Sequence, residues 1–489
     1  MNVLIIFPND YLSNGIPTGI ATLSAVLKEH GHNIEIFDYT FLKTTHINHD
    51  ATGGKSVFLP TEYTINDLVA NDPIVVIEEE LQKKIDKFNP GLIIVSAMTG
   101  YVQEVIKLLK KVNIKSKVIF GGVHATICPK ETIENDNIDM ICVGEGEELL
   151  IELTDALEKG TDYTSIRNLG YKRRRAVYFN DLRPLIDLDD LPTPDWELYD
   201  ERHLFRPFMG KIYRGSYYVM SRGCPYRCSY CVNDSLRKTF QNHGRYFRYQ
   251  SAKTTIKQLK ALKERYDATW FKFVDDSIGY FDIEYLEELA DGLKPLNINF
   301  GCLIRVESIN EEKVKLLKDM GMVAASIGIE SGNQNIRKTI LNRHMTNDQI
   351  LEPIRLLKKY DVRISTFNMI GLPTETRDNV FETIRLNKKA GVNATNVYII
   401  YPYPGTEINI KYNINIYDNN GEIIPVSKAA SFALSNMKPK EVEGLLRTFE
   451  LYVRVPEDKW EQVRKGEGED NASLEMRKSI EKYILGVSA

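Results

Sequence analysis

The chain has 489 residues, 43% of them hydrophobic, which is enough to build two or three domains with their own cores. Its net charge of −4 gives no overall basic field, so nucleic acid is not expected as a partner. There is no run of 18 apolar residues and no signal peptide, which argues against a membrane span and predicts a cytoplasmic protein.

In the N-terminal third, apolar strand-like runs alternate with amphipathic helical stretches. The expected strands are 2–7, 33–38, 92–96, 117–120 and 138–143. Apolar residues recur every three or four positions in 74–88 and 102–112 and again from Leu149, as the buried stripe of a helix requires. This alternation predicts an α/β fold with a doubly wound, Rossmann-like parallel sheet over residues 1–160, interrupted by the polar segment 42–70.

Three glycine-containing loops follow the last three of these strands. Ligands of doubly wound sheets bind at the carboxyl ends of the strands, and glycine lets the backbone come close to a bulky ligand. The alternative is that these glycines only close tight turns between strand and helix. The candidate ligand-binding residues of the three loops are Ser96, Thr99, Gly100, Gly121, Gly122, His124, Gly144, Glu145 and Gly146.

Residues 161–210 are charged and interrupted by prolines, which predicts a linker. From 211 to 407 the alternation of strand and helix resumes with six repeats, which predicts a partial (β/α)6 barrel of the TIM type. The expected strands are 216–221, 269–275, 299–305, 323–330, 363–370 and 394–400. The expected helices are 252–265, 282–292, 310–319, 346–359 and 376–389.

Cys224, Cys228 and Cys231 follow the first barrel strand with the spacing C-x3-C-x2-C. Three thiolates at this spacing can hold three irons of a [4Fe–4S] cluster, which normally takes four cysteines, and the last iron is then open to a substrate or cofactor. A structural zinc site would need a fourth ligand, and His243 downstream has no partner at zinc-finger spacing. A disulfide framework is disfavoured because six cysteines in 489 residues are sparse.

With Tyr230 directly before Cys231, the motif C-x3-C-x-aromatic-C resembles the radical S-adenosylmethionine (SAM) superfamily. The N-terminal loops, in their order and spacing, are similar to the cobalamin-binding domain that precedes many barrels of this superfamily. The resemblance covers residues 2–407. It implies three cofactors, namely a [4Fe–4S] cluster on the three cysteines, SAM and cobalamin.

The resemblance also implies which residues bind SAM, because polar motifs stand at successive strand ends of the barrel. Asp275, Asp276 and Ser277 match the position that takes the ammonium group, and Arg305 can bind the carboxylate through its planar fork. The alternatives are a helix cap for one aspartate and a simple ion pair for Arg305. The remaining candidates are Tyr230 in the cysteine motif, Glu330 and Ser331 near the ribose or amino group, and Gly371 against the adenine.

For cobalamin, the loop 8–15 departs from one family pattern. It lacks the D-x-H-x-x-G of cobalamin domains that replace the lower axial base. The lower face of the cobalt is therefore expected to be water-bound or unligated, with His124 as a less favoured ligand. A flavin- or nucleotide-binding domain is the alternative interpretation of residues 1–160.

The activity that the resemblance implies is reductive cleavage of SAM to a 5′-deoxyadenosyl radical, hydrogen abstraction from an unactivated carbon, and methyl transfer from methylcobalamin. Cyclisation or rearrangement without methyl transfer is the first alternative, and an iron–sulfur electron-transfer protein is an alternative of another class. The expected partners are a small-molecule or peptide substrate and a reductant such as flavodoxin or ferredoxin. The protein is expected to be a monomer.

Residues 408–489 match no family pattern. Segment 410–425 is irregular, and helices are expected at 439–454, 457–466 and 471–484. We expect this α-rich C-terminal extension to cap the barrel mouth and to shape the substrate pocket.

Overall fold

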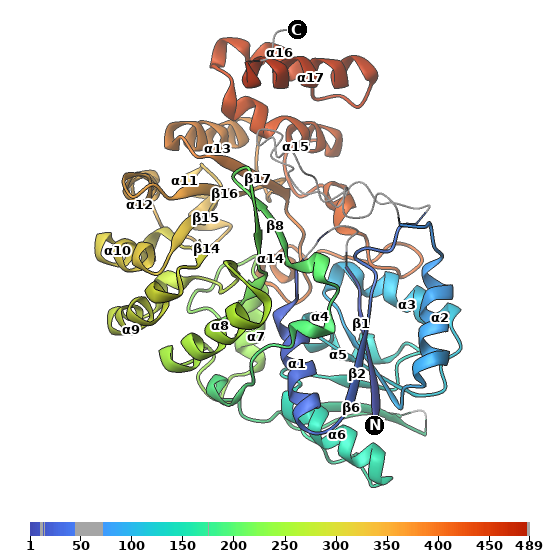
Figure 1. Ribbon diagram of the computed structural model, residues 1–489. Helices are drawn as coiled ribbons and strands as arrows, with labels where there is room; N and C mark the ends of the chain where they lie inside the picture. The colour runs from blue at the N-terminus through green and yellow to red at the C-terminus, as the bar shows by residue number, and fades with distance from the viewer. Residues whose placement is uncertain (10–12, 14, 45–71, 175, 487–489) are drawn as a thin grey trace.

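The computed structural model describes residues 1–9, 13, 15–44, 72–174 and 176–486. Two largely parallel sheets, each accompanied by helices, are followed by a helical C-terminal region (Figure 1). From residue 45 onward, the polar segment predicted at 42–70 lies outside the described residues.

The N-terminal sheet has the strand order β2-β1-β3-β4-β5-β6-β7. Its parallel strands are β1 (Asn2–Phe7), β2 (Asn33–Asp38), β3 (Leu92–Ser96), β4 (Lys117–Gly121) and β5 (Met140–Cys142). Two antiparallel strands, β6 (Leu169–Arg173) and β7 (Ala176–Phe179), continue it. This hairpin falls within segment 161–210, where the sequence predicts a linker.

Alternate strand residues of this sheet enter two different cores, as the doubly wound prediction requires. Ile5 and Ile94 pack with α1 (Thr18–Glu29) and α6 (Glu147–Lys159). Their neighbours, such as Leu4 and Ile93, pack on the opposite face. The helices on that face are α2 (Ile77–Phe88) and α3 (Val102–Lys111).

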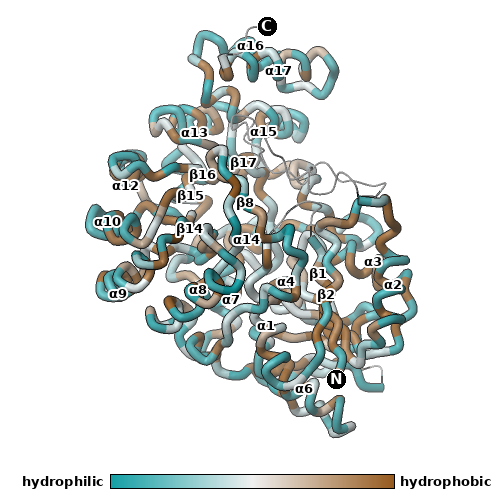
Figure 2. The backbone as a smooth tube through the Cα atoms, viewed as in Figure 1, coloured by the Kyte–Doolittle hydropathy of each residue, from teal (hydrophilic) through white to brown (hydrophobic). Residues whose placement is uncertain are grey.

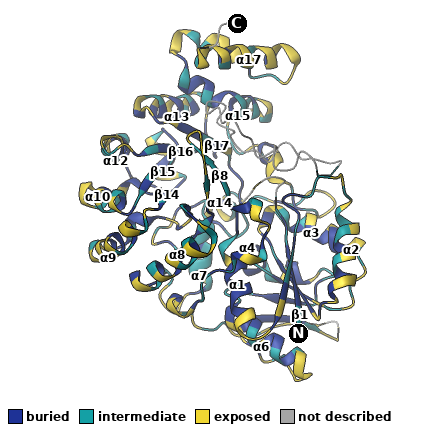
Figure 3. Cartoon of the chain, viewed as in Figure 1, coloured by how far each residue is buried: buried dark blue, intermediate teal, exposed yellow. Residues whose placement is uncertain are grey.

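The second sheet has the order β10-β13-β14-β15-β16-β17, and every pairing in it is parallel. Its strands are β10 (Tyr217–Tyr218), β13 (Trp270–Phe273), β14 (Asn299–Ile304), β15 (Met322–Glu330), β16 (Arg363–Ile370) and β17 (Ala394–Ile399). The helices between them are α8 (Ala252–Tyr266), α9 (Ile283–Leu293), α10 (Glu311–Asp319), α12 (Asn347–Lys359) and α13 (Arg377–Ala390). Hydrophobic, buried strands and helices with polar, exposed outer faces give the layering of a partial (β/α)6 barrel (Figures 2 and 3).

The first barrel strand differs from the prediction of one strand over 216–221. It divides into β10 and a separate strand β11 (Ser221–Arg222), which pairs with β12 (Arg248–Tyr249) in an antiparallel hairpin. The backbone N–H of Met220, between the two, donates to the carboxylate of Asp275 at 2.9 Å. A side chain therefore replaces the neighbouring strand as hydrogen-bond partner, and the chain leaves the sheet.

The tail contributes a helix to the barrel. Helix α15 (Pro439–Arg454) packs against β17 and α13, the place that a sixth barrel helix would take (Figure 1). Helices α16 (Trp460–Lys465) and α17 (Asn471–Leu485) lie beyond α15. Ile416 and Ile423 join the core on the α2–α3 face of the N-terminal sheet. Within the described residues, no helix combines the length and the apolar character needed to span a bilayer.

Candidate active site

The three motif cysteines lie in the loop between β11 and α7 (Val232–Thr239). The loop begins at Gly223, whose φ is +83° and where a Cβ would lie 2.4 Å from the carbonyl oxygen of Tyr246, so only glycine fits. The Arg237 guanidinium donates to the carbonyl of Tyr226 at 2.5 Å and also to that of Cys224. The conformation of the loop is therefore stabilised by the glycine turn at its start and by the hydrogen bonds from Arg237 of α7.

The cysteine side chains fit a cluster held through three irons. Cys224 and Cys228 are buried, Cys231 is half-buried, and all three thiols are free. Arg305 Nη1 donates to Cys228 Sγ at 2.9 Å, a charge-assisted contact that favours a thiolate. No three His, Cys, Asp or Glu side chains of the described residues converge on a single ion. Each thiolate of a cubane binds a different iron, so such convergence is not required.

The two aspartates at the end of β13 face different ways. Asp275 is buried, and its Oδ1 accepts hydrogen bonds from Met220 N at 2.9 Å and from Ser221 Oγ at 2.5 Å. Burial raises the pKa of Asp275 to about 6. Asp276 is exposed and accepts from Asn233 Nδ2 at 3.1 Å, and this amide also lies 3.7 Å from Cys231 Sγ. Asp276 therefore faces the cysteine loop, whereas Asp275 holds the β11 hairpin.

Ser277 and Arg305 are already paired with protein groups. Ser277 Oγ accepts from the backbone N–H of Arg305 at 3.2 Å. The Arg305 fork donates to Glu307 Oε1 at 2.7 Å as well as to Cys228, and its guanidinium stacks 3.5 Å from the centroid of the Tyr226 ring. The arginine predicted to bind the methionine carboxylate thus stands beside the cysteine loop in a barrel-mouth ion pair.

Glu330 ends β15 in a strained conformation. Its φ of +66° is rare for a residue with a side chain, and strain of this kind concentrates at functional sites. Its carboxylate lies over Gly328, where a Cβ would approach Glu330 Oε1 to 2.3 Å. The Tyr230 hydroxyl donates to Glu330 Oε1 at 3.1 Å, and Arg343 Nη1 lies 3.6 Å from the same oxygen. Burial raises the pKa of Glu330, and the positive charge of Arg343 opposes that rise.

Arg343 is a site residue that the sequence did not reveal. It is buried, and it also donates to the Gly328 carbonyl at 2.6 Å and to the Tyr230 hydroxyl at 3.2 Å. It lies between α11 (Gln334–Thr339) and α12, in a segment with no local motif. Only its three-dimensional contacts connect it to the cysteine loop.

The other two barrel candidates, Ser331 and Gly371, make structural contacts. Ser331 is fully buried, its carbonyl accepts from Arg337 Nη1 at 2.6 Å, and its hydroxyl accepts from Asn333 N at 3.3 Å. Gly371 follows β16, and a Cβ there would lie 3.3 Å from both Ile399 and Val442. Val442, a residue of α15, is therefore the tail side chain that lies nearest to Gly371. Among the described residues, no hydrogen bond joins Ser331 or Gly371 to the cysteine loop.

At the end of the N-terminal sheet, Thr99 and His124 form a buried pair. Ser96 is the last residue of β3, and Thr99 Oγ1 lies 3.2 Å from His124 Nδ1. Burial lowers the pKa of His124 to about 4, so the imidazole is neutral. Its Nε2 has no hydrogen-bond partner among the described residues. An unpartnered, neutral imidazole nitrogen at this sheet edge fits a bound group with polar atoms.

Several loop glycines contact protein atoms. A Cβ on Gly122 would lie 2.8 Å from the carbonyl oxygen of Ala97, and one on Gly121 would lie 3.6 Å from Cys142. At Gly100 the neighbour is Val426 of the tail, and at Gly146 it is the sulfur of Cys142. Of these four positions, Gly122 requires a glycine, because its φ is +95° and its contact is close, whereas a Cβ at Gly121 or Gly146 would make ordinary van der Waals contacts. The close-turn alternative is therefore supported at Gly122.

The loop after β5 binds the hairpin that carries the cysteines. Glu145 accepts from Arg222 Nη1 at 2.9 Å and also from Arg248, and Glu147 accepts from Arg222 Nη2 at 2.5 Å. Gly144 leaves room for the Phe240 ring, 2.8 Å from where its Cβ would be. The sequence assigned Glu145 to cobalamin and did not single out the two arginines. The structure shows that Glu145 joins the N-terminal sheet to β11 and β12.

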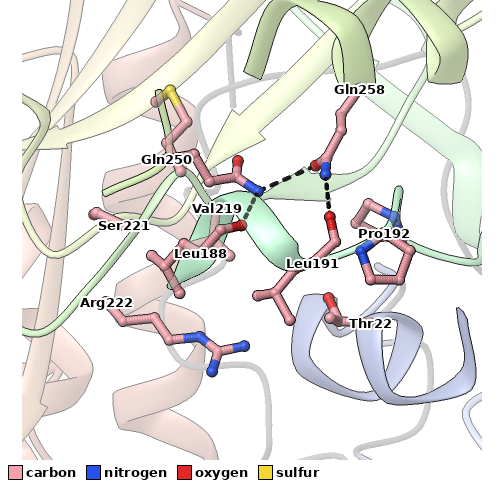
Figure 4. Close-up of a pocket in the computed structure, with 11 residues that line it drawn as sticks. Thr22, Leu188, Leu191, Pro192, Val219, Ser221, Arg222, Gln250 and Gln258 are labelled. Atoms are coloured by element: carbon pink, nitrogen blue, oxygen red, sulfur yellow. Dashed lines mark hydrogen bonds between the residues drawn. The ribbon is translucent and has the colours of Figure 1, made fainter. Parts of the chain in front are cut away.

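A small cavity of about 20 Å³ lies behind this hairpin, bounded by α1, the segment 188–194 and β11 (Figure 4). Gln258 donates to the Leu191 carbonyl at 2.9 Å, and Gln250 to the Leu188 carbonyl at 3.2 Å. The amides that line the cavity are thus used to hold the incoming chain. None of the cysteines lines the cavity, which is therefore separate from the cysteine side chains.

Comparisons with known proteins identify both halves of the chain. Residues 9–154 match the model of the B12 binding domain, and residues 218–403 match the model of the radical SAM superfamily. The chain is 28% identical over 404 residues to an uncharacterized methyltransferase of Pyrococcus horikoshii, a match that covers 81% of this chain and 78% of the relative. It is 23% identical over 492 residues to the anaerobic magnesium-protoporphyrin IX monomethyl ester cyclase of Rubrivivax gelatinosus, covering 95% and 80%.

Solved structures share this fold over nearly the whole chain. The methyltransferase TsrM of Kitasatospora setae, with cobalamin and a [4Fe–4S] cluster bound, superposes with a TM-score of 0.66 at 14% identity, covering 98% of this chain and 99% of TsrM. The enzyme OxsB, with aqua-cobalamin and SAM bound, gives 0.64 at 15% identity, covering 99% and 71%. The two sheets follow one another along the chain in the same order as the two family models. The chain therefore belongs to the radical SAM enzymes that carry an N-terminal B12-binding domain.

Proposed function

We propose that this protein is a cobalamin-dependent radical SAM enzyme and that its reaction is the methylation of an unactivated carbon. The observation that carries the proposal is the contact between the two halves. The hairpin that leads into Cys224 is bound directly by Glu145 and Glu147 of the B12-binding domain. A domain for a methyl-carrying cofactor is thus attached to the loop that holds a redox cluster.

When bound, the cluster and SAM supply a 5′-deoxyadenosyl radical, and cobalamin supplies a transferable methyl group. The chain holds and shields these groups. Cys224, Cys228 and Cys231 provide the thiolates, and Arg305 places a positive charge beside the sulfur of Cys228. We propose that Asp276 takes the ammonium group of SAM, because it is the aspartate that faces the cysteine loop without being used by the β11 hairpin.

Glu330, Arg343 and the half-buried Tyr230 form a second group on the rim, which we propose orients SAM at its ribose or amino group. The hydrogen bond from Tyr230 and the charge of Arg343 hold the Glu330 carboxylate in one position. A fixed acceptor of this kind orients a hydroxyl or amino group without reorganisation. At the edge of the N-terminal sheet, we propose that Ser96, Thr99 and His124 face cobalamin. Support for this comes from the unpartnered nitrogen of His124.

Cyclisation without methyl transfer is the second candidate, because the Rubrivivax gelatinosus relative that matches 95% of this chain is a cyclase. An electron-transfer role would not require the SAM contacts that we propose for Asp276 and Glu330. For partners, we propose a small-molecule or peptide substrate and a flavodoxin or ferredoxin reductant. We further propose that the protein acts as a monomer in the cytoplasm.

The decisive test is anaerobic reconstitution with iron, sulfide and hydroxocobalamin, followed by assay with SAM that carries a deuterated methyl group. We expect the visible spectra of cobalamin and of an iron–sulfur cluster, the release of 5′-deoxyadenosine, and deuterium in the product by mass spectrometry. A product without label would favour the cyclase. Cluster binding without SAM cleavage would favour an electron-transfer protein. If the reconstituted protein bound no cobalamin, the proposed methylation would be wrong.

The cluster assignment is tested by Cys228→Ala. We expect loss of the bound iron and of 5′-deoxyadenosine formation, because only two thiolates remain. Cys128→Ala, at a half-buried cysteine in the N-terminal domain, is the matched control and should keep both. Turnover by Cys228→Ala would contradict the cluster assignment.

A further inference from the structure

The inner face of the barrel sheet carries polar side chains that the proposed cofactor contacts do not use. Residues such as Phe271 and Ile327 point outward and are buried against the helices, and the residues between them face inward. Lys272 on β13, Ser326 on β15 and Ser365 on β16 have this inward parity. They are not neighbours in sequence, and the sheet alone brings them together.

Lys272 is connected to two serines and to no acid. Its Nζ donates to Ser326 Oγ at 3.1 Å, and Ser326 Oγ lies 2.9 Å from Ser365 Oγ. Ser326 and Ser365 are also register partners in the sheet. Within the described residues Ser326 is the hydrogen-bond acceptor of Lys272, and no carboxylate forms an ion pair with it. Burial lowers the pKa of its ammonium group. A partly buried ammonium without a counter-charge is unfavourable until an anion binds.

Hydrogen-bond donors outnumber acceptors around this lysine. An ammonium group has three N–H donors, and only one of those of Lys272 has a described acceptor. Trp270 Nε1, which can only donate, is buried without a partner among the described residues. A Cβ on Gly301 would lie 3.6 Å from both Lys272 Cδ and Trp270 Cζ2, so the two side chains flank the space that this glycine leaves. A ligand for this place has to be rich in acceptors.

The lysine and the first serine lie at the same depth in the barrel. Lys272 precedes Asp276 by four positions, and Ser326 precedes Glu330 by four. Both therefore stand deeper in the barrel than the rim residues that we propose for SAM. The donors are therefore inside the barrel, below the place of SAM and not part of it.

The layer between the rim and these donors is partly open and has an apolar part. Val274 is 36% exposed and Tyr398 is 43% exposed, whereas the Glu330 carboxylate takes the space over Gly328. The rings of Phe367 and Tyr398 have centroids 6.3 Å apart. A molecule that reaches Lys272 from the rim thus passes an aromatic and aliphatic wall before it meets the ammonium group.

We propose that Lys272, with Ser326, Ser365 and Trp270, forms a binding subsite for an anionic group of the substrate, and hence that the substrate is an organic acid or phosphate ester with an apolar body. The proposal rests on the proposed function in taking the barrel interior as the substrate chamber. The anion, a carboxylate or a phosphate, would accept hydrogen bonds from the free N–H groups of Lys272 and from Trp270. The apolar body would then extend toward the rim, where the radical is made.

The test is affinity labelling of the reconstituted enzyme with pyridoxal 5′-phosphate, an anionic aldehyde that reacts with lysine, followed by borohydride and peptide mass spectrometry. Uncharged pyridoxal is the matched probe. We expect Lys272 to be labelled at least tenfold faster by the phosphate form, and exposed Lys253 to react equally with both. Inorganic phosphate or acetate should slow the labelling of Lys272, and the more effective of the two identifies the preferred anion.

Equal labelling of Lys272 by both probes, no labelling, or no protection by either anion would overturn the proposal. A second measurement uses the fluorescence of the neighbouring tryptophan. Inorganic phosphate should change the emission of the unaltered protein and of Lys272→Arg and Lys253→Met, but not that of Lys272→Met. Release of 5′-deoxyadenosine without substrate is measured separately, so failure of the anion subsite and failure of the radical SAM assignment give different results.

Discussion

The two adjacent aspartates, which are alike in sequence, have separate consequences when changed. Asp276→Asn removes the negative charge that we place against the ammonium group of SAM. We expect KM for SAM to rise about tenfold, equivalent to about 1.4 kcal/mol, with the cluster spectrum unchanged. Asp275→Asn should instead lower the melting temperature, because Asp275 holds Met220 and Ser221. If Asp275→Asn changed KM and Asp276→Asn did not, the two assignments would have to be exchanged.

Glu375 makes stability depend on pH. Burial raises the pKa of its carboxyl to about 8, from about 4.5 in the unfolded chain, and Oε1 has no partner among the described residues. Between these values the folded protein holds a proton that the unfolded chain has lost, so stability falls as pH rises from 4.5 to 8.

Glu375→Gln removes this titration and keeps an acceptor for the backbone N–H of Leu372, which now donates at 3.2 Å. We expect the variant to gain about 2–4 kcal/mol relative to the parent between pH 5 and pH 8. Denaturant unfolding at the two pH values measures this gain. A difference between the proteins that is constant with pH would show that Glu375 is ionised in the folded state.

At the scale of elements, the hairpin β11–β12 depends on the neighbouring domain. Glu145→Gln weakens the contacts to Arg222 and Arg248, whose side chains are 24% and 14% exposed. We expect a loss of about 2 kcal/mol in unfolding free energy and faster loss of iron from the cluster, since the hairpin leads into Cys224. Glu148→Gln breaks the pair of a half-exposed carboxylate with Arg183 and should change stability by less than about 0.5 kcal/mol. Equal effects of the two variants would argue that the Glu145 contact is a surface ion pair.

The elements themselves were largely predictable, because apolar runs and helical stripes are local signals. The strands 363–370 and 2–7 have the predicted bounds. The strand predicted at 216–221 was wrong because the apolar run does not reveal that Asp275, more than 50 residues later, captures Met220. Arg343 and the partners of Glu145 were missed for the same reason. Their contacts are long-range ion pairs, which leave no periodic pattern in the sequence.

At the scale of the whole molecule, the tail connects the two halves. Lys107 forms a 2.7 Å ion pair with Glu422, and the buried Ile416 packs into the core beside α2 and α3. Ile416→Ala should cost about 2–4 kcal/mol and make the segment 412–425 a site of rapid proteolysis in the folded protein. Ile410→Ala, at a position 65% exposed, should change neither property. Proteolysis that is unaltered in Ile416→Ala would show that this anchor is not needed.

The contact between Glu145 and Arg222 also sets an order of assembly. The two residues are 77 positions apart, so at 5–20 residues per second the acidic partner leaves the ribosome about 4–15 s before the basic one. The domain that docks the hairpin has time to fold before Cys224, Cys228 and Cys231, the iron ligands that we propose, have been synthesised. Maturation of the metal centre is thereby a late event in the life of the nascent chain, guided by a surface that is already formed.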